Sequence, residues 1–266
     1  MLENPRSPRV RAVAKLTKRS ARAETGLFLL EGPQAVREAL TFRAEAIVDL
    51  FATPTAIERH QDLRSAAVAA DVEITYTTEA VLDAMADTVT PQGLVAVARQ
   101  FPTGVRDVFA ARPKLIAICE EVRDPGNLGT IIRAADAAGA DAVVLTGRTV
   151  DPYNPKVVRA TTGSLFHVAI SLGGELSDVA SAARAAGLRV IAADVKGGDL
   201  LAARGEGMLA EPTAWLFGNE ARGLDDAALA LADTALRLPI YGRAESLNLA
   251  TAASVCLYES AFAQRA

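Results

Sequence analysis

The sequence predicts an α/β protein of two domains, the second of them built on a mostly parallel sheet. Strand-like and helix-like stretches alternate over most of the 266 residues, which is the pattern of βα units. The alternation is interrupted at residues 102–113, where Pro102, Gly104 and Pro113 give the composition of a linker. Hydrophobic residues make up 50% of the chain but aromatic residues only 5%. The core must therefore be mainly aliphatic, which favours α/β packing.

The N-terminal domain is predicted over residues 1–101. Residues 1–23 form a basic segment in which Glu3 is the one acidic residue, and the segment contains Arg6, Arg9, Arg11, Lys15, Lys18, Arg19 and Arg22. This segment either contacts phosphate groups or is a solvated, partly disordered tail. Strands are expected at residues 26–30, 46–51, 73–77 and 93–98, with helices from Pro33 and over residues 56–70 and 78–86.

The C-terminal domain is predicted over residues 114–266. We expect strands at residues 115–120, 142–145, 167–171, 189–193, 214–217 and 234–238. Helices are expected over residues 127–138 and 176–186, and from residues 155 and 248. Strands separated by helices at this spacing predict a sheet covered on both faces.

Several classes of protein are excluded by composition. No run reaches the roughly 20 apolar residues of a membrane span, and charges stand where a signal peptide is apolar. We therefore expect a cytoplasmic protein without membrane contact. Cys119 and Cys256 lie far apart, and His60 and His167 are the only histidines, so we expect reduced, buried thiols and no metal. The net charge of −4 argues against a protein that coats nucleic acid through charge alone.

Familiar nucleotide-binding and hydrolase motifs are missing. No G-x-G-x-x-G follows a strand and no G-x-x-x-x-G-K-[ST] occurs, which removes the usual grounds for a dinucleotide site or a P-loop. A Ser-His-Asp triad is also unsupported, because His60 is in the N-terminal domain. His167 lies in a strand-like run, where we expect a hydrogen-bonded buried or edge histidine.

Three polar segments follow strands of the C-terminal domain, where parallel sheets bind their ligands. After the strand at 115–120, Asn127 is interpreted as a helix N-cap, and Arg133 is suited to clamp a phosphate or ribose. After the strand at 214–217, Gly218 permits close backbone approach to a ligand. Glu220 in this segment is either a residue of the site or a surface carboxylate that is exposed to solvent or paired with Arg222.

The third segment follows the strand at 234–238 and contains Ser246 and Asn248, which could simply cap the last helix. In this order, the three segments resemble the signature motifs of the SpoU family of RNA 2′-O-ribose methyltransferases, within the SPOUT superfamily. Residues 151–166 are similar to the family's middle loop and helix. The resemblance covers residues from Lys114 onward, and the first domain looks like the family's small substrate-binding domain.

The resemblance implies a C-terminal domain with a trefoil knot that binds S-adenosyl-methionine, in a homodimer that modifies RNA. It implies mostly backbone contacts to the cofactor, made by Gly218, Asn219, Leu238, Ile240 and Leu247. It assigns the catalytic positions to Asn127, Arg133, Glu220, Ser246 and Asn248. Arg133 would bind the target and stabilise the developing alkoxide, because a guanidinium cannot readily act as a base. Asn127 and Glu220 would position Arg133 and the ribose.

The substrate that the resemblance favours is ribosomal RNA, 23S ribosomal RNA in particular, because a folded extra N-terminal domain is typical of family members that act on it. Transfer RNA is the alternative substrate. A non-catalytic RNA-binding assembly factor with the same fold is a further alternative, against which the complete polar set argues. A dinucleotide-dependent enzyme is opposed by the missing glycine fingerprint.

Overall fold

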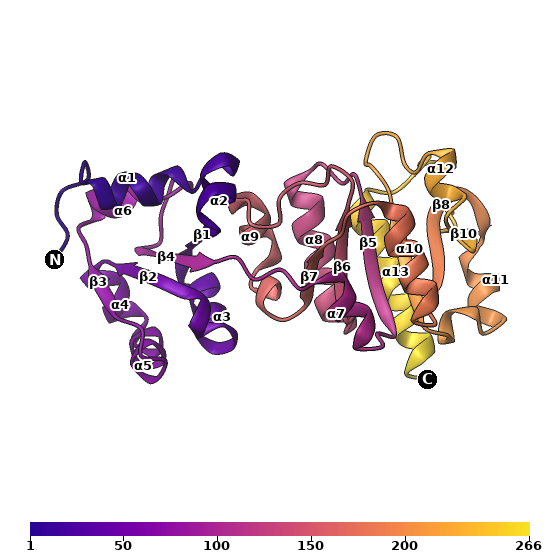
Figure 1. Ribbon diagram of the computed structural model, residues 1–266, viewed down its shortest axis with the longest axis horizontal. Helices are drawn as coiled ribbons and strands as arrows, with labels where there is room; N and C mark the ends of the chain where they lie inside the picture. The colour runs from indigo at the N-terminus through magenta and orange to yellow at the C-terminus, as the bar shows by residue number, and fades with distance from the viewer. The chain divides into compact units, whose positions relative to one another are not determined.

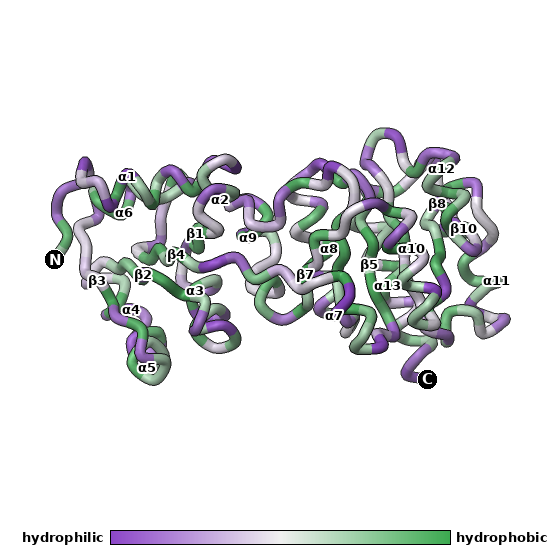
Figure 2. Tube along the Cα trace, in the orientation of Figure 1, coloured by the Kyte–Doolittle hydropathy of each residue, from purple (hydrophilic) through white to green (hydrophobic).

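The computed structural model describes all 266 residues, which form two compact units (Figure 1). Unit 1 consists of residues 1–101 and 151–167, and unit 2 of residues 102–150 and 168–266. None of the helices is long and apolar enough to cross a membrane. Figure 2 shows hydrophobic residues concentrated along strands such as β5 (Leu115–Glu120), as expected for strands buried on both faces.

Unit 1 is built on a four-stranded mixed sheet in the order β1-β4-β2-β3. Its strands are β1 (Leu27–Glu31), β2 (Ile47–Ala52), β3 (Ile74–Tyr76) and β4 (Leu94–Arg99). Its helices are α1 (Pro8–Lys15), α2 (Arg19–Thr25), α3 (Gly32–Phe42), α4 (Pro54–Arg59), α5 (Gln61–Ala69), α6 (Glu79–Met85) and α9 (Pro155–Thr161). Strand β4 runs antiparallel to both neighbours, whereas β2 and β3 are parallel.

The basic N-terminal segment is folded, so its interpretation as a disordered tail is wrong. Helices α1 and α2 form there, and Val10, Val13 and Leu16 are buried in the core of unit 1. The signal for α1 is the spacing of these apolar residues, which places them on one helix face. Arg22 is also buried, whereas the other basic residues of the segment are exposed.

Residues 151–167 belong to unit 1, although the sequence analysis placed them in the C-terminal domain. The Tyr153 ring packs against Phe28 and Phe101, with ring centroids 4.7 and 5.8 Å away. Arg159 forms ion pairs with Glu31 (3.1 Å) and Asp87 (2.9 Å). Buried aromatic contacts and ion pairs between residues so distant in sequence leave no periodic pattern that local analysis can detect.

Unit 2 contains a six-stranded parallel sheet in the order β10-β8-β9-β5-β6-β7. Besides β5, its strands are β6 (Ala142–Thr146), β7 (Ala169–Leu172), β8 (Arg189–Asp199), β9 (Thr213–Phe217) and β10 (Thr234–Arg237). Its helices are α7 (Val105–Ala110), α8 (Pro125–Ala138), α10 (Leu176–Ala185), α11 (Leu200–Gly205), α12 (Asp226–Leu229) and α13 (Leu249–Gln264). Figure 1 shows α10 in front of the sheet and α13 behind it, so both faces are covered as predicted.

The segment predicted as a linker contains a packed helix. Val108 and Phe109 of α7 are buried in the same apolar cluster as Ile116, Ile118 and Val190 of the sheet. Prolines at both ends of the segment suggested a turn-rich connection, but Gly104 stands at the N-cap of α7 and leaves the six residues after it free to form a helix.

Candidate active site

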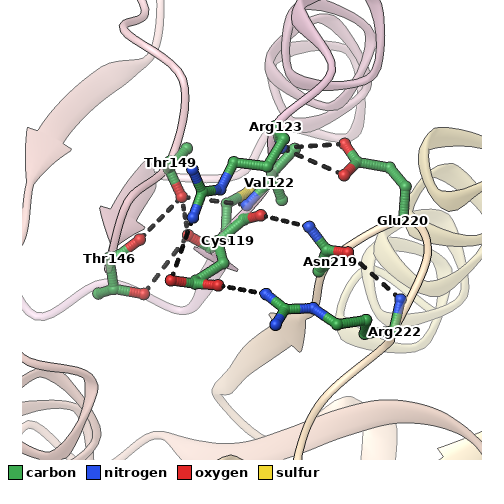
Figure 3. A network of polar contacts seen from close by, with 9 residues as sticks. Cys119, Val122, Arg123, Thr146, Thr149, Asn219, Glu220 and Arg222 are labelled. Atoms are coloured by element: carbon green, nitrogen blue, oxygen red, sulfur yellow. Dashed lines mark hydrogen bonds and ion pairs between the residues drawn. The ribbon is translucent and has the colours of Figure 1, made fainter.

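Three loops of unit 2 extend from the carboxyl ends of its strands. Residues 121–124 join β5 to α8, residues 218–225 join β9 to α12, and residues 238–248 join β10 to α13. Strands β5 and β9 pair directly, from Leu115 opposite Thr213 to Cys119 opposite Phe217. The first two loops therefore begin side by side, and Figure 3 shows their side chains meeting.

The N-cap of α8 is Asp124, so the interpretation of Asn127 as the cap is wrong. Asp124 Oδ1 accepts a hydrogen bond from the Asn127 backbone N–H (2.8 Å), and Pro125 occupies the first turn. Asn127 is then inside the helix, and its amide side chain is free to bind elsewhere. Its Nδ2 donates to Glu220 Oε1 (3.3 Å) and its Oδ1 accepts from Asn248 Nδ2 (2.9 Å).

The Glu220 carboxylate binds the loop that precedes α8. It accepts hydrogen bonds from the backbone N–H groups of Arg123 (3.2 Å) and Asp124 (3.0 Å), in addition to the Asn127 amide. Burial by itself raises the pKa of the Glu220 carboxyl, but these hydrogen bonds outweigh it and place the pKa below the ordinary value. Glu220 is therefore an ionised acceptor at neutral pH that ties the two loops together.

Arg222 does not pair with Glu220, contrary to one of the sequence-based interpretations. It binds Glu121 Oε2 at 2.7 Å, and Figure 3 shows the Arg222 side chain pointing away from Glu220. Asn219, beside Glu220, donates from Nδ2 to the Glu121 backbone carbonyl (2.9 Å) and accepts from the N–H groups of Ala221 and Arg222. Asn219 thus holds both loops in shape.

Gly218 makes a close approach within its own chain, while its predicted contact with a ligand stays a prediction. A Cβ atom on Gly218 would lie 2.6 Å from the backbone of Gly223. Asn219 and Gly223 form an isolated antiparallel bridge, and Gly223 has φ +67°. The close approach at Gly218 is therefore to the returning loop of the same chain, and Gly223 supplies the left-handed conformation of the turn.

Asn248 caps α13, as one interpretation predicted, and also binds Asn127. Its Oδ1 accepts from the N–H groups of Ala250 (2.9 Å) and Thr251 (3.2 Å). Its Nδ2 takes no part in capping and donates to Asn127 Oδ1 of α8. The structure therefore brings together three of the five predicted catalytic residues, in the order Glu220, Asn127, Asn248.

Arg133 and Ser246 lie outside this hydrogen-bonded group. The Arg133 side chain is exposed on α8 and makes no hydrogen bond or ion pair with protein groups. The structure does not show Asn127 or Glu220 holding Arg133, as the sequence analysis expected, because their side chains bind each other. Ser246 is exposed in the loop after β10 and lines a cavity.

That cavity has a volume of about 410 Å³ and lies wholly within unit 2. Four of the five residues predicted to bind the cofactor line it, namely Asn219, Leu238, Ile240 and Leu247, and Gly218 does not. Apolar walls from Phe217, Leu236 and Leu249 stand beside polar groups of Glu220, Arg222 and Ser246. A small ligand with an aromatic part and a charged part fits such a lining.

Four charged residues of the cavity lining were not predicted from the sequence, namely Asp194, Lys196, Asp226 and Arg237. The first two come directly after the strand predicted at residues 189–193. The rule that ligands bind at the carboxyl ends of parallel strands, applied to that strand as well, would have found them.

Both cysteines are buried, as predicted, and neither is a nucleophile at neutral pH. Burial raises the pKa of the Cys119 thiol to about 12, with a smaller contribution from the Glu220 charge. Burial likewise raises the pKa of Cys256, whose side chain stands at the cavity. Neither thiol is therefore a candidate for the chemistry of the site.

Comparison with known proteins agrees with this geometry. The model of the "SpoU rRNA Methylase family" matches residues 114–258, which is more than half of the chain. The chain belongs to the SpoU family. A second model, described as "MRM3-like substrate binding domain", matches residues 7–96. The resemblance seen in the sequence and the predicted enzyme class, a methyltransferase, are thereby confirmed.

Individual relatives extend over both units. The "23S rRNA (guanosine(2553)-2'-O)-methyltransferase RlmP" of Bacillus subtilis is 34% identical, over 97% of each chain. The crystal structure of an AdoMet-bound rRNA methyltransferase from Sinorhizobium meliloti has a TM-score of 0.82 at 32% identity, covering 97% of this chain and 96% of that one. The structure of AviRb from Streptomyces viridochromogenes with AdoMet has a TM-score of 0.80 at 30% identity, covering 97% and 99%. The predicted fold class and the predicted cofactor, S-adenosyl-methionine, are confirmed.

Proposed function

We propose that this SpoU-family chain transfers a methyl group from S-adenosyl-methionine to a ribose 2′-hydroxyl of 23S ribosomal RNA. The observation that carries the proposal is the Glu220–Asn127–Asn248 group beside a cavity of suitable size and lining. Relatives covering nearly the whole chain bear names of 23S rRNA 2′-O-methyltransferases, which supports the choice of substrate. S-adenosyl-methionine, when bound, supplies an electrophilic methyl group.

In this proposal the cavity holds the cofactor, and the Glu220–Asn127–Asn248 group orients the ribose. The cofactor would contact four residues that line the cavity, namely Asn219, Leu238, Ile240 and Leu247. Gly218 follows β9 directly before Asn219, and its backbone would meet the cofactor next to that lining. Ser246 and Asn248 shape the loop where donor and acceptor meet, and alignment of the 2′-oxygen with the methyl carbon contributes much of the rate.

Arg133 acts on the RNA side of the reaction. Its guanidinium is exposed and has no protein partner. It is therefore available to bind the target phosphate or ribose and to stabilise negative charge as the 2′-hydroxyl loses its proton. The cofactor would supply the methyl group to the 2′-oxygen with its sulfur as the leaving group, and the hydroxyl proton would go to solvent or a nearby base while Arg133 stabilises the charge.

Residues 1–101 form the RNA-binding domain in this proposal, and residues 114–266 the methyltransferase domain, with residues 102–113 between them. Exposed side chains of α1 and α2 and the residues around them would meet phosphates, namely Arg6, Arg11, Lys15, Lys18 and Arg19. The match of residues 7–96 to a substrate-binding domain supports this division of labour.

The trefoil knot, the homodimer and a cytoplasmic location belong to the same proposal. Support for the dimer comes from α13, which exposes Val255, Tyr258 and Phe262 along one side. The Tyr258 and Phe262 rings lie 5.5 Å apart and form an apolar surface. A second copy of this chain would cover that surface, and the size of the native protein in solution tests it.

The experiment that tests the proposed function offers unmodified 23S rRNA and, separately, unmodified transfer RNA to the protein with radiolabelled S-adenosyl-methionine. We expect label in the ribosomal RNA only. Label in transfer RNA alone would reassign the substrate. Cofactor binding without transfer to either RNA, or to a ribosomal particle, would support a binding protein that has kept the fold.

A further inference from the structure

Two arginines of unit 2 share one carboxylate beside the candidate active site. Glu121 Oε1 accepts a hydrogen bond from Arg123 Nη2 at 3.3 Å, and Glu121 Oε2 accepts one from Arg222 Nη2 at 2.7 Å. The arginines come from different loops, one after β5 and one after β9, and Figure 3 shows their side chains reaching toward the same place. None of these three residues has a role in the function proposed above.

Glu121 is held in an unfavourable backbone conformation. Its φ is +52°, in the left-handed region that non-glycine residues rarely adopt. Its carbonyl accepts from Asn219 Nδ2 (2.9 Å), and its N–H donates to the Thr146 carbonyl (3.3 Å). Strain that surrounding contacts maintain in this way is concentrated at functional sites. The backbone therefore fixes the place from which the Glu121 carboxylate binds both arginines.

Most of the donor capacity of the two guanidinium groups is unused. Each binds protein through one nitrogen only, and the exposed fractions of the side chains are 47% for Arg123 and 72% for Arg222. Glu121 balances one of the two positive charges. Glu220 already accepts from backbone N–H groups and from Asn127. The neighbouring Glu120 carboxyl interacts with the Glu121 charge, and burial raises its pKa. Two guanidinium groups with free, forked donors are therefore presented at this edge of the sheet.

We propose that Arg123 and Arg222 together bind one phosphodiester group of the substrate RNA, and that Glu121 positions them for it. The proposal rests on the RNA substrate proposed above. Guanidinium groups suit this ligand because their planar donors match the oxygens of a phosphate. Arg123 is joined to the site by its own backbone N–H, which donates to Glu220. The bound phosphate would thus be held at a fixed place relative to Asn127 and the target ribose.

One other oxyanion is available at this place. Arg222 also lines the cavity assigned to S-adenosyl-methionine, whose carboxylate is a second acceptor for a guanidinium. The Arg123 side chain is not part of that lining. An RNA phosphate is therefore the better candidate for an oxyanion that binds both arginines. Separate measurements of the affinity for RNA and for the cofactor distinguish the RNA phosphate from the cofactor carboxylate.

The experiment compares Arg123→Ala, Arg222→Ala and the double variant with the wild-type protein. Arg106→Ala is the matched control, because Arg106 is an exposed arginine of α7 without a protein partner, on the segment that enters the amino end of β5. Affinity for in vitro transcribed 23S rRNA is measured over a series of salt concentrations, and affinity for S-adenosyl-methionine by calorimetry.

We expect each single variant to bind RNA about fivefold more weakly or worse, with cofactor affinity unchanged in Arg123→Ala, which lies outside the cavity lining, and Arg106→Ala like the wild type. Loss of one phosphate contact on a single strand lowers the slope of log K against log salt by about 0.7. The double variant should lose about that amount and no more, because both arginines bind the same phosphate.

Unchanged RNA affinity and slope in the double variant, with a wild-type protein that binds RNA, would overturn the phosphate site and leave the proposed function standing. Weaker cofactor binding by Arg222→Ala with unchanged RNA affinity would assign Arg222 to the cofactor carboxylate and also overturn it. A wild-type protein that binds no RNA would overturn both proposals.

Glu121→Gln tests the positioning role, since glutamine keeps the length of the side chain but not its charge. We expect the KM for RNA to rise about threefold to tenfold, as for loss of a charge-assisted hydrogen bond, with kcat and cofactor affinity unchanged. In the Arg123→Ala, Arg222→Ala background the same substitution should have no further effect. An equal effect in both backgrounds would show that Glu121 does not act through the two arginines.

Discussion

Asn248 donates a hydrogen bond from Nδ2 to Asn127 Oδ1 over 2.9 Å, across 121 residues of sequence. The contact joins the N-terminus of α13 to that of α8. Because Asn248 Oδ1 accepts from Ala250 and Thr251 at the same time, one side chain both begins a helix and completes the polar group of the site. Function and stability can therefore be separated by the choice of substitution.

Substitution of Asn248 should separate capping from catalysis. Asn248→Ser keeps an N-cap oxygen but removes the amide that reaches Asn127, so we expect stability close to wild type and at least tenfold slower transfer. Asn248→Ala also removes the cap and should lower the free energy of unfolding by about 1 kcal/mol more. Urea unfolding and single-turnover transfer measure the two effects. Wild-type transfer by the serine variant would contradict a role for the Asn248–Asn127 contact.

Glu220→Gln should weaken the protein at neutral pH and flatten its acid denaturation. The folded pKa of Glu220 is lowered, so its carboxylate stabilises the fold above the unfolded value of about 4.3. This contribution is lost as the pH falls through the lower folded value. The amide of glutamine also meets backbone N–H donors of Arg123 and Asp124, which costs about 1 kcal/mol or more. The urea midpoints of the wild-type and Glu220→Gln proteins are measured from pH 3 to 7 in roughly unit steps. The same pH dependence in both proteins would contradict a stabilising role of the Glu220 charge.

Glu120→Gln should have the opposite effect, a more stable protein at neutral pH. Burial raises the pKa of the Glu120 carboxyl; the Glu121 charge adds to this effect, and the hydrogen bond from Thr146 opposes it. The Glu120 Oε2 atom has no hydrogen-bond partner. A raised folded pKa means that stability is lost as the pH rises from the unfolded value toward the folded one. The variant should therefore exceed wild type at pH 7 and match it near pH 4, by urea unfolding. A variant less stable than wild type at pH 7 would contradict this account.

Arg133→Ala should abolish methyl transfer with little effect on folding or cofactor binding. The side chain is exposed and unpartnered, so the free energy of unfolding should change by less than about 0.5 kcal/mol. Arg133→Lys keeps the charge without the planar fork and should retain a small part of the activity. Transfer assays and cofactor calorimetry measure both. Loss of cofactor affinity in a folded Arg133→Ala protein would show that Arg133 binds the cofactor, which would contradict its assignment to the RNA.

Arg22→Ala should destabilise unit 1 strongly. The Arg22 guanidinium is buried, binds Asp151 at 2.7 Å and donates to the carbonyls of Leu16 and Thr17 at 2.9 Å. Its removal leaves these acceptors without a partner, at a cost of about 3 kcal/mol. Arg19→Ala, an exposed residue of the same helix, is the control and should change stability little. Similar unfolding curves for both variants would contradict the role of Arg22.

Local sequence patterns were sufficient for most elements of unit 2. Strand β5 lies at the residues predicted, and helices α8, α10 and α13 begin within about two residues of expectation. These elements have strong apolar patterns and clear capping signals, which act over short range. Helix α7 was missed because prolines around it suggested a loop, although Val108 and Phe109 already marked a buried face.

Contacts between distant residues could not be predicted in the same way. Arg22 appeared to be one basic residue among seven, yet it alone is buried against Asp151. The polar set Asn127, Glu220 and Asn248 was found through the family resemblance, whereas its internal order follows from Asp124 taking the cap of α8. Which of several neighbouring residues caps a helix depends on contacts in the folded protein, because more than one of them is a suitable N-cap residue type.

The central claim is transfer to a ribose 2′-oxygen, and the identity of the methylated nucleoside tests it most directly. Unmodified 23S rRNA is incubated with the protein and S-adenosyl-methionine, digested to nucleosides and analysed by mass spectrometry, with Arg133→Ala as the control. We predict a single 2′-O-methylated nucleoside that is absent from the control. A methyl group on a base, or equal product from the Arg133→Ala protein, would contradict the account.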